Sequence, residues 1–294
     1  MQYVSLFYGL NMTREFLETK IRRVFDEFSN EEWCDLNSSL LNADSYFATV
    51  NQQKYILKYY GAYFCELYGM YEKFIREFKE NELTVLSFGC GSGVDCEALN
   101  RVIVDLGKNI EINYVGIDIV NWNYRPNFPW ATFKTMCASE IKTSDVADVD
   151  LFVFPKSLTE LSKETRGRIG ELISQGSSKE HIFFINTYVT DNAVDGNRVD
   201  GIAQFSTINN ILKNANWSCS SSPTEYLYKT NGDWLGYNFN FFKLPDELKP
   251  FVEKLKVNCQ NQDGSSECIK CDIDFIPILN SRYLAFNLLE YKRN

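Results

Sequence analysis

A glycine-rich pentapeptide, Gly89-Cys90-Gly91-Ser92-Gly93, is the segment whose residue types point most clearly to ligand binding. An apolar stretch at residues 83–88 runs into it, and a helical pattern begins directly after it. Glycine lets a chain turn sharply and lets a ligand approach the backbone without a Cβ in the way. The first turn of the following helix offers free N–H groups and a partial positive charge. We therefore expect this strand–loop–helix unit to bind a ligand.

An acidic residue, Asp118, ends the next predicted strand. A carboxylate at that place can accept hydrogen bonds from both ribose hydroxyls of a nucleoside cofactor. Dinucleotide-binding loops follow the pattern G-x-G-x-x-G, and here Gly89 and Gly91 fit the first two places, whereas Val94 occupies the third. The combination indicates a nucleoside cofactor and disfavours a nucleotide-binding oxidoreductase.

Short apolar runs alternate with helical patterns from residue 83 onward, which favours a parallel sheet with right-handed crossovers. The residues before this region form helical patterns, including a long one at 52–78 with a wide apolar face. Two late segments, 237–244 and 282–293, are expected to complete the sheet at one edge. The predicted strands are 83–88, 112–117, 131–136, 151–154 and 182–185, and the predicted helices between and after them are 94–106, 158–173 and 202–212.

The glycine segment resembles motif I of the class I S-adenosylmethionine-dependent methyltransferases, D/E-x-G-x-G-x-G, and residues 148–158 resemble motif IV of that family. The resemblance covers roughly residues 83–188. It implies an α/β Rossmann-like fold, with a mostly parallel seven-stranded sheet that includes an antiparallel edge strand. We accordingly expect a helical N-terminal cap at 1–80 and a catalytic domain at 81–294, with an insertion around 244–280.

The resemblance also implies S-adenosyl-L-methionine as the cofactor and assigns residues to it. The glycine loop would bind the methionine part, the end of strand two the ribose, and the residues after strand three the adenine, while the exit of strand four would lie beside the methyl group. One position departs from the pattern, because Ser87 stands where an acidic residue is expected and cannot offset the cofactor's positive charge. The cofactor-binding candidates are Ser87, Gly89, Cys90, Gly91, Ser92, Gly93, Asp118, Ile119, Ala138, Ser139, Pro155, Lys156 and Ser157.

Methyl transfer from a sulfonium is an in-line displacement, so catalysis is mostly positioning, with a base required only if the acceptor carries a proton. The sequence indicates no such base, and the catalytic residues stay unassigned. One group of nucleic-acid amino-methyltransferases carries Asn or Asp followed by Pro-Pro and an aromatic residue after strand four. This chain has Phe154-Pro155-Lys156-Ser157 there, which disfavours membership of that group. Tyr60 and Tyr63 are candidates to line an acceptor pocket.

The net charge of −9 disfavours a protein that binds nucleic acid over its whole surface, but it does not exclude a local basic cleft. A small molecule or a protein side chain is therefore the favoured methyl acceptor, and a nucleic-acid acceptor is the less favoured one. The competing hypothesis from another class is a methyltransferase-like binding or scaffold protein that acts through a protein partner. Ser87 and the lack of an evident base keep that hypothesis open.

The remaining composition bears on location and metals. No apolar run approaches the roughly 20 residues that span a bilayer, and the start of the chain does not resemble a secretion signal, so we expect a cytoplasmic protein with no membrane partner. His181 is the one histidine, and we expect it to be a packing or surface residue. Cys259, Cys268 and Cys271 include a pair with zinc-knuckle spacing but no evident fourth ligand. Free thiols and no metal site are the favoured interpretation, and structural zinc stays open.

Overall fold

The computed structural model describes residues 19–24, 26–27, 43–189, 201–223, 228–229 and 284–294. The chain divides into two compact units, which are treated separately below. The first comprises Met1–Cys65, Trp122–Tyr124 and Gly236–Ser281, and the second comprises Glu66–Asn121, Arg125–Leu235 and Arg282–Asn294. The predicted late strand at 237–244, the predicted insertion around 244–280 and the three cysteines Cys259, Cys268 and Cys271 lie outside the described residues.

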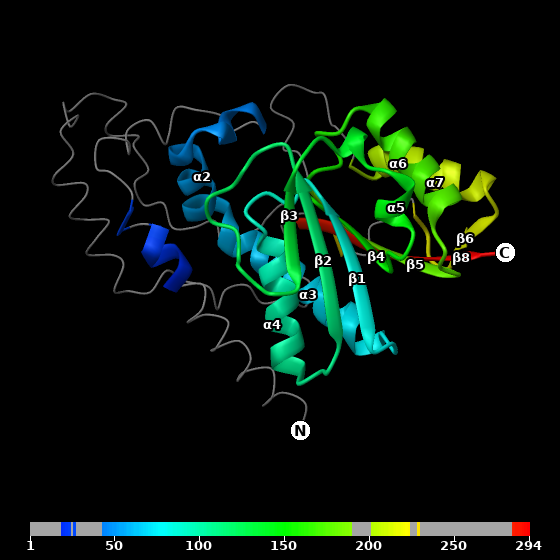
Figure 1. The fold of residues 1–294 in the computed structure, drawn as a ribbon, viewed down its shortest axis with the longest axis horizontal. Helices are drawn as coiled ribbons and strands as arrows, with labels where there is room; N and C mark the ends of the chain where they lie inside the picture. Colours follow the sequence, from blue (N-terminus) through cyan, green and yellow to red (C-terminus); the bar gives the residue numbers. More distant parts are fainter. Residues whose placement is uncertain (1–18, 25, 28–42, 190–200, 224–227, 230–283) are drawn as a thin grey trace. The chain divides into compact units, whose positions relative to one another are not determined.

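The second unit is built on one twisted sheet, whose strands run in the order β3-β2-β1-β4-β5-β8-β6, with β7 also paired to β8 (Figure 1). The pairs among β1 to β5 are parallel, and β8 runs antiparallel to β5, β6 and β7. The strands are β1 (Glu82–Phe88), β2 (Glu111–Asp118), β3 (Ala131–Thr135), β4 (Leu151–Pro155), β5 (His181–Val189), β6 (Trp217–Cys219), β7 (Tyr228–Lys229) and β8 (Leu284–Arg293).

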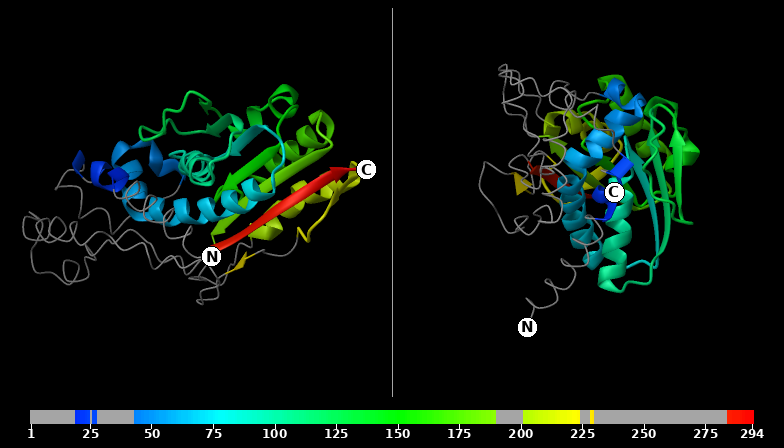
Figure 2. Two further views of the ribbon diagram at one scale, coloured as in Figure 1. Left: turned by 90° about the horizontal axis from the view of Figure 1, so that it is seen from below. Right: turned by 90° about the vertical axis from the view of Figure 1, so that its left-hand side faces the viewer.

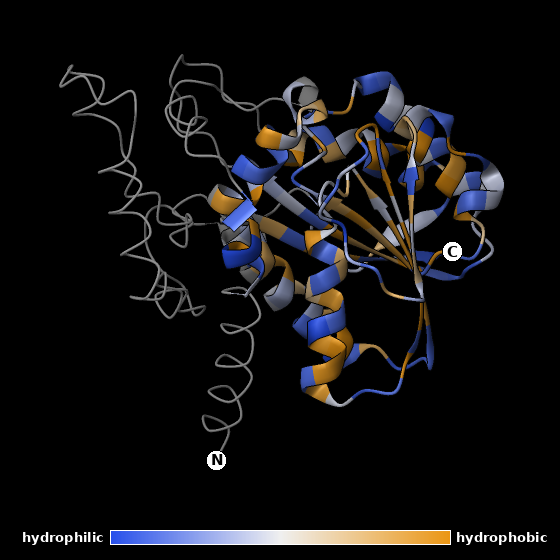
Figure 3. Ribbon diagram, turned by 60° about the vertical axis from the view of Figure 1, so that its left-hand side comes forward, coloured by the Kyte–Doolittle hydropathy of each residue, from blue (hydrophilic) through white to orange (hydrophobic). Residues whose placement is uncertain are grey.

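This strand order confirms the predicted fold class, a Rossmann-like class I methyltransferase fold. All five predicted parallel strands form, and residues 284–293 of the predicted late strand form β8, the long red strand in Figure 2. The antiparallel strand β8 lies between β5 and β6, so the outermost strand on this side of the described sheet is the short β6. Figure 3 shows that the central strands are mostly hydrophobic, as expected for strands that helices cover on both faces.

Helices cover both faces of the sheet. An apolar cluster fills one face, where α6 (Lys163–Gly176) and α7 (Gly201–Asn214) pack on alternate residues of β1, β4 and β5. The other face carries α4 (Val94–Leu106) and the second-unit part of α3 (Gly61–Glu77), and there Phe74 of α3 contacts the ring of Phe183 with a centroid separation of 5.1 Å. Two short helical segments, η5 (Ala138–Glu140) and α5 (Thr143–Val146), follow β3.

The helix predicted at 158–173 begins later than expected. Residues 157–161 form turns in which the N–H groups of Glu160 and Leu161 both donate to the carbonyl of Ser157. Helix α6 starts at Lys163, because the Ser162 hydroxyl caps it by accepting from the N–H of Thr165 at 3.1 Å. The helix predicted at 94–106 matches α4, and Gly107 ends it in the left-handed conformation, at φ +58°.

The first unit contains residues 52–65 of the long helix predicted at 52–78. From residue 43 onward this unit runs from η3 (Ala43–Phe47) through α2 (Thr49–Tyr55) and a π-helical segment, η4 (Ile56–Tyr60), into α3. The π segment interrupts the helix directly before Gly61, one of the two glycines in the predicted helix. The units divide within α3, after Cys65, and the boundary expected near residue 80 stays a prediction.

Candidate cofactor site

The glycine loop turns sharply at the carboxyl end of β1. Gly89, Gly91 and Gly93 have φ angles of +65°, +54° and +73°, in the region that favours glycine. The N–H groups of Gly89 and Cys90 donate to the carbonyl of Ile117 at 2.8 and 3.1 Å, which ties the loop to β2. The first half of the sequence motif therefore forms the turn that it predicts.

Neighbouring side chains leave no room for a Cβ at two of these glycines. A Cβ on Gly89 would lie 2.6 Å from the Cβ of Ser157, and a Cβ on Gly93 would lie 2.7 Å from the Cδ of Pro126. Ser157 is buried, and its hydroxyl donates to the carbonyl of Phe88. The loop is therefore held against the exit of β4, where the sequence analysis placed Pro155, Lys156 and Ser157.

Asp118, at the carboxyl end of β2, binds the loop directly. Its Oδ2 accepts from the N–H of Gly91 at 2.8 Å, and its Oδ1 accepts from the N–H of Val120 at 2.8 Å. Both oxygens of this carboxylate therefore accept from backbone N–H groups at the carboxyl end of β2 and in the glycine loop. Ile119, the next predicted contact, is 43% exposed.

The loop lies where the strand order reverses, since β1 has β2 on one side and β4 on the other. In open α/β sheets ligands bind at this place, outside the carboxyl ends of the strands. The structure brings together the predicted residues that follow β1, β2 and β4. Ala138 and Ser139 follow β3 in η5, where Ala138 packs into the apolar cluster and the Ser139 hydroxyl donates to Cys137 Sγ at 3.0 Å.

Arg125 belongs to this site and was missed by the sequence analysis. Its Nε donates to the carbonyl of Gly91 at 3.2 Å, and its Nη2 donates to the carbonyl of Val120 at 2.9 Å. The guanidinium carbon also lies 5.1 Å from the centre of the Phe133 ring. Arg125 therefore joins the glycine loop to the segment after β2. A single arginine in an irregular segment carries no sequence signal that could have revealed this contact.

Lys156, directly after β4, has a strained backbone and a buried ion pair. Its φ is +63°, in the region that non-glycine residues rarely adopt, and its N–H donates to the carbonyl of Thr187 at 3.1 Å. The ammonium contacts Glu66 Oε2 of α3 at 2.7 Å and donates to the carbonyl of Tyr188 at 2.7 Å. The side chains of Lys156 and Glu66 are 10% and 0% exposed, so the ammonium is directed into the protein.

Burial changes the acid–base properties of this pair. Burial raises the pKa of Glu66 to about 7, although the charge and the hydrogen bond of Lys156 oppose that rise. Burial also lowers the pKa of Lys156, against the attraction of Glu66. The two pKa values are therefore closer together than those of the free side chains.

A second buried acid, Asp95, lies in the first turn of α4, next to Ser87 of β1. Asp95 and Ser87 are both 0% exposed, and Asp95 Oδ2 accepts from the Tyr114 hydroxyl at 2.8 Å. Burial raises the pKa of Asp95 to about 6, whereas hydrogen bonding by Ser87 and Tyr114 opposes the rise. Within the described residues, neither Ser87 Oγ nor Asp95 Oδ1 makes a hydrogen bond of standard geometry, although Ser87 is close enough to lower the pKa of Asp95.

Glu160, in the turn after Ser157, adds a third acidic group near the loop. Desolvation and the negative charge of Asp118 both raise the pKa of the Glu160 carboxyl. The residue is exposed, so solvent reduces this effect. Acidic groups thus lie at the carboxyl ends of β2 and β4 and in the first turn of α4.

A cavity of about 200 Å³ is lined by residues of β1, β2, β3 and α5 and of the segments that follow β3 and α5. None of the thirteen predicted cofactor contacts lines it. The described residues include no cluster of His, Cys, Asp and Glu side chains able to hold a metal ion. Within the same residues, no helix is long and apolar enough to cross a membrane.

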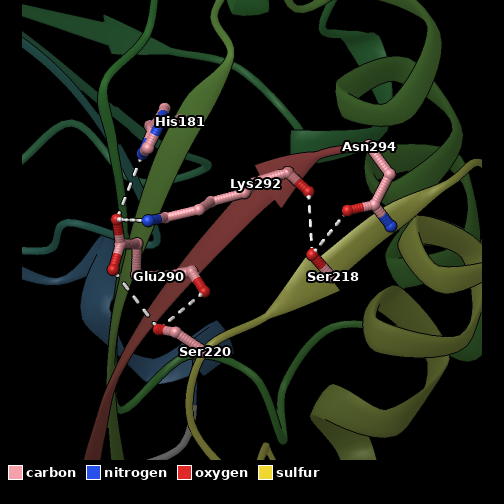
Figure 4. A network of polar contacts seen from close by, with 6 residues as sticks. All are labelled: His181, Ser218, Ser220, Glu290, Lys292 and Asn294. Atoms are coloured by element: carbon pink, nitrogen blue, oxygen red, sulfur yellow. Dashed lines mark hydrogen bonds and ion pairs between the residues drawn. The ribbon is translucent and has the colours of Figure 1, made fainter.

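His181 has a surface role, as predicted. Figure 4 shows it at the start of β5, where its Nδ1 lies 3.1 Å from Glu290 Oε1 of β8. Lys292 and Ser220 also contact the Glu290 carboxylate, at 3.6 and 3.3 Å. Partial burial tends to raise the pKa of Glu290, but hydrogen bonding by His181 and the charge of Lys292 outweigh it, so that the pKa is lowered.

Comparison with known proteins gives structural matches only. No family model matches the chain, and no curated protein matches its sequence. A plantazolicin methyltransferase in complex with S-adenosylhomocysteine and a substrate analogue is 11% identical, with 97% of this chain and 99% of that chain covered and a TM-score of 0.41. The magnesium protoporphyrin IX methyltransferase of Synechocystis, with bound S-adenosylmethionine, is 10% identical, with 97% of each chain covered and a TM-score of 0.39.

A TehB-like methyltransferase of Corynebacterium glutamicum is 13% identical, with 76% of this chain and 87% of that chain covered and a TM-score of 0.37. At such identities the likeness concerns the fold alone, and the assignment of the fold to this chain rests on its own strand order. The reversal of that order at β1, the single antiparallel strand beside β5 and the glycine loop at the reversal point together give this chain the fold of the class I S-adenosylmethionine-dependent methyltransferases.

Proposed function

We propose that the chain is an S-adenosylmethionine-dependent methyltransferase. The observation that carries the proposal is the charge at the glycine loop. Asp118 accepts from the loop at Gly91, and the first turn of α4 contains two buried acids, Asp95 and Glu97. A dinucleotide site places a pyrophosphate at this helix end, where the two carboxylates would repel it. A nucleoside with a sulfonium and an ammonium group fits the same charges.

The shape of the loop fits the same ligand. The absence of a side chain at Gly89 brings the backbone close to Ser157 at the exit of β4, and the absence of one at Gly93 brings it close to Pro126 and Phe133. The Asp118 carboxylate lies beside the loop, at the end of β2, where a ribose would lie. We place the amino-acid part of the cofactor at residues 89–93, the ribose at Asp118, the adenine beside Ile119, Ala138 and Ser139, and the methyl group near residues 155–157. When bound, the cofactor supplies an activated methyl group, and the protein's own residues bind and orient it.

The favoured acceptor is a small molecule or a protein side chain. The net charge of −9 and the acidic groups around the loop would repel the phosphates of a nucleic acid. Tyr60 is fully buried and Tyr63 is partly buried in the first unit, where Tyr63 stacks on Tyr59 with a centroid separation of 5.7 Å. Their part in an acceptor pocket stays a prediction.

Calorimetric titration of the full chain with S-adenosylmethionine, S-adenosylhomocysteine and NADH tests the proposal. We expect both sulfur nucleosides to bind and NADH to give no heat of binding. The opposite selectivity, or binding by none of the three at high micromolar concentrations, would refute the proposed cofactor.

The ribose contact has its own test. Asp118→Ala should weaken the binding of S-adenosylhomocysteine by about 1–3 kcal/mol, because hydrogen-bonding groups lose their partner. Because Asp118 also holds the loop, the 2′-deoxyadenosyl analogue of S-adenosylhomocysteine should be titrated in parallel. The analogue should lose less affinity than the parent compound on substitution, and equal losses would assign Asp118 to the loop alone.

The second candidate function is a binding protein of this fold that performs no turnover. The serine at position 87, in place of an acidic residue, is the observation that favours it. Incubation with methyl-labelled S-adenosylmethionine and panels of small-molecule, protein and RNA acceptors separates the two. Transfer of label to any panel supports the enzyme, and tight cofactor binding without transfer to any of them favours the binding protein.

A further inference from the structure

Ser87 stands at the position where the methyltransferase pattern has an acidic residue, so a negative charge is missing there. It is one residue before the end of β1, fully buried, and paired in register with Gly116 of β2 and Val153 of β4. Its side chain is on the face of the sheet that carries α3 and α4. The serine carries no charge, and its Oγ is one of the buried polar atoms of the described residues without a hydrogen bond of standard geometry.

A carboxylate from a different element lies beside it. Asp95 comes from α4, two residues after the last glycine of the loop, and its Oδ2 is fixed by the Tyr114 hydroxyl at 2.8 Å. Its Oδ1 makes no hydrogen bond of standard geometry within the described residues, although it is completely buried. Hydrogen bonds offset only part of the desolvation cost of this carboxylate, since its pKa stays raised, and a nearby positive charge would offset more of that cost.

We propose that Asp95 supplies the negative charge that this chain lacks at Ser87, and that its carboxylate compensates the positive charge of S-adenosylmethionine bound at the glycine loop. The inference rests on the proposed function, because it needs that cofactor. In this chain the acidic group comes from the first turn of α4 instead of from β1, and Ser87 and Tyr114 act as positioning residues for it.

Hydrogen bonds from Ser87, Tyr114 and the N–H groups of Asp95 and Cys96 stabilise the Asp95 carboxylate, and no cationic side chain is among the described groups that act on it. The remaining groups that interact with its charge are neutral thiols and phenols, whose own pKa values that charge raises. The charges of two further residues act on Cys90: Asp118 raises the pKa of the Cys90 thiol, and Arg125 lowers it. The interacting groups are Tyr71 of α3, Tyr114 of β2, and Cys90 and Cys96 on either side of the loop's end.

Cofactor binding should therefore be coupled to ionisation of this carboxyl. A bound cation favours the charged form, so it lowers the pKa of Asp95 from its free value of about 6. Between pH 5 and 7 binding then releases a proton, and affinity rises with pH by about tenfold for each unit by which the pKa is lowered. S-adenosylhomocysteine, which lacks the sulfonium charge, should show a weaker dependence.

The experiment is calorimetric titration of the wild-type chain with both nucleosides at pH 5.5, 6.5 and 8, in buffers with different ionisation enthalpies. We expect proton release with S-adenosylmethionine at the two lower pH values and none at pH 8. Asp95→Asn keeps the size and the hydrogen bond to Tyr114. It should weaken S-adenosylmethionine binding at pH 8 by at least about tenfold, the equivalent of one pKa unit, and remove the proton release.

The control is Asp150→Asn, which removes a buried acid directly before β4, where its carboxylate accepts from the N–H of Thr84 at the far end of the strands from the glycine loop. It should leave the proton release and the selectivity between the two nucleosides unchanged. Near-ultraviolet circular dichroism shows whether each variant is folded. If Asp95→Asn does not fold, the number of protons that the wild type releases on binding still tests the inference.

The outcomes separate the two proposals. Failure of the wild type to bind either nucleoside overturns the proposed function, and this inference with it. Binding by the wild type without proton release, or an equal loss of affinity for both nucleosides in Asp95→Asn, overturns the inference and leaves the proposed function in place. Selective loss of S-adenosylmethionine affinity together with loss of proton release supports it.

Discussion

The two faces of the sheet are both buried, yet they are built from different chemistry. The face that carries α6 and α7 is an apolar cluster, in which Phe88, Phe152 and Phe184 stack in a row. The face that carries α3 and α4 buries Glu66, Asp95 and Ser87 close to the carboxyl ends of the strands. Packing alone explains the first face. Burying the charged groups of the second face carries a desolvation cost, which fits the cofactor-binding role that we propose for this face.

The largest expected effect is on the apolar face. Phe152 is fully buried, with ring centroids 6.5 Å from Phe88 and 5.3 Å from Phe184. Phe152→Ala should lower the free energy of unfolding by about 3–5 kcal/mol, because it leaves a cavity in a close-packed core. Urea denaturation followed by circular dichroism measures it. A loss below about 1 kcal/mol would contradict close packing on this face.

The ion pair on the polar face should give the next largest effect. Lys156→Met leaves Glu66 buried without its partner and should cost about 3 kcal/mol. The lone Glu66 would then be protonated in the folded state and ionised in the unfolded state above its ordinary pKa of 4.5. The variant's stability should therefore fall as pH rises from 5 to 8.

Combining Lys156→Met with Glu66→Gln provides the control for that prediction. The double variant should recover part of the lost stability and show no fall between pH 5 and 8, because no buried carboxyl remains at that position. Denaturant titrations at the two pH values measure both effects. A pH-independent loss in the single variant would show that Glu66 is not the uncompensated charge.

Two glycines in the same backbone conformation separate strain from crowding. Gly107→Ala places a Cβ where no atom lies within 4 Å, so it should cost only the left-handed strain of about 1–2 kcal/mol. Gly89→Ala adds a contact of 2.6 Å with Ser157 to the same strain. It should cost more than Gly107→Ala and, unlike Gly107→Ala, weaken S-adenosylhomocysteine binding. Equal losses of stability and affinity would remove the argument for a close approach at Gly89.

The smallest expected effect is at the β5–β8 surface. Glu290 has a lowered pKa, so its interactions stabilise the protein above the ordinary pKa of 4.5 and are lost as pH falls below that value. The side chain is 31% exposed, and exposed ion pairs contribute about 0–1 kcal/mol. Glu290→Gln should lower stability by that amount at pH 7 and by less at pH 4. An effect above 2 kcal/mol would place Glu290 among the buried charges instead.

Local patterns predicted the elements and the loop, because strand and helix periodicity and glycine conformation depend on neighbours in the sequence. The turn at Gly89–Gly93 and the place of Asp118 at the end of β2 follow from such patterns. The partner of Lys156 did not, since Glu66 is 90 residues away. Asp95 resembles any acid in the first turn of a helix. Only the packing of α4 on β1 shows that it is buried beside Ser87.

The position of β8 has a consequence for how the sheet forms. Residues Leu284–Arg293 pair with β5 on one side and with β6 on the other, so β6 has its place in the sheet only through β8. The pairing of His181 with Lys292 closes a loop of more than a hundred residues. Such distant pairings form slowly, because the chain must lose loop entropy before the contacts compensate it. We therefore expect docking of β8 to be a late step in folding, and the exposed edge of β5 to be the surface through which partly folded chains associate.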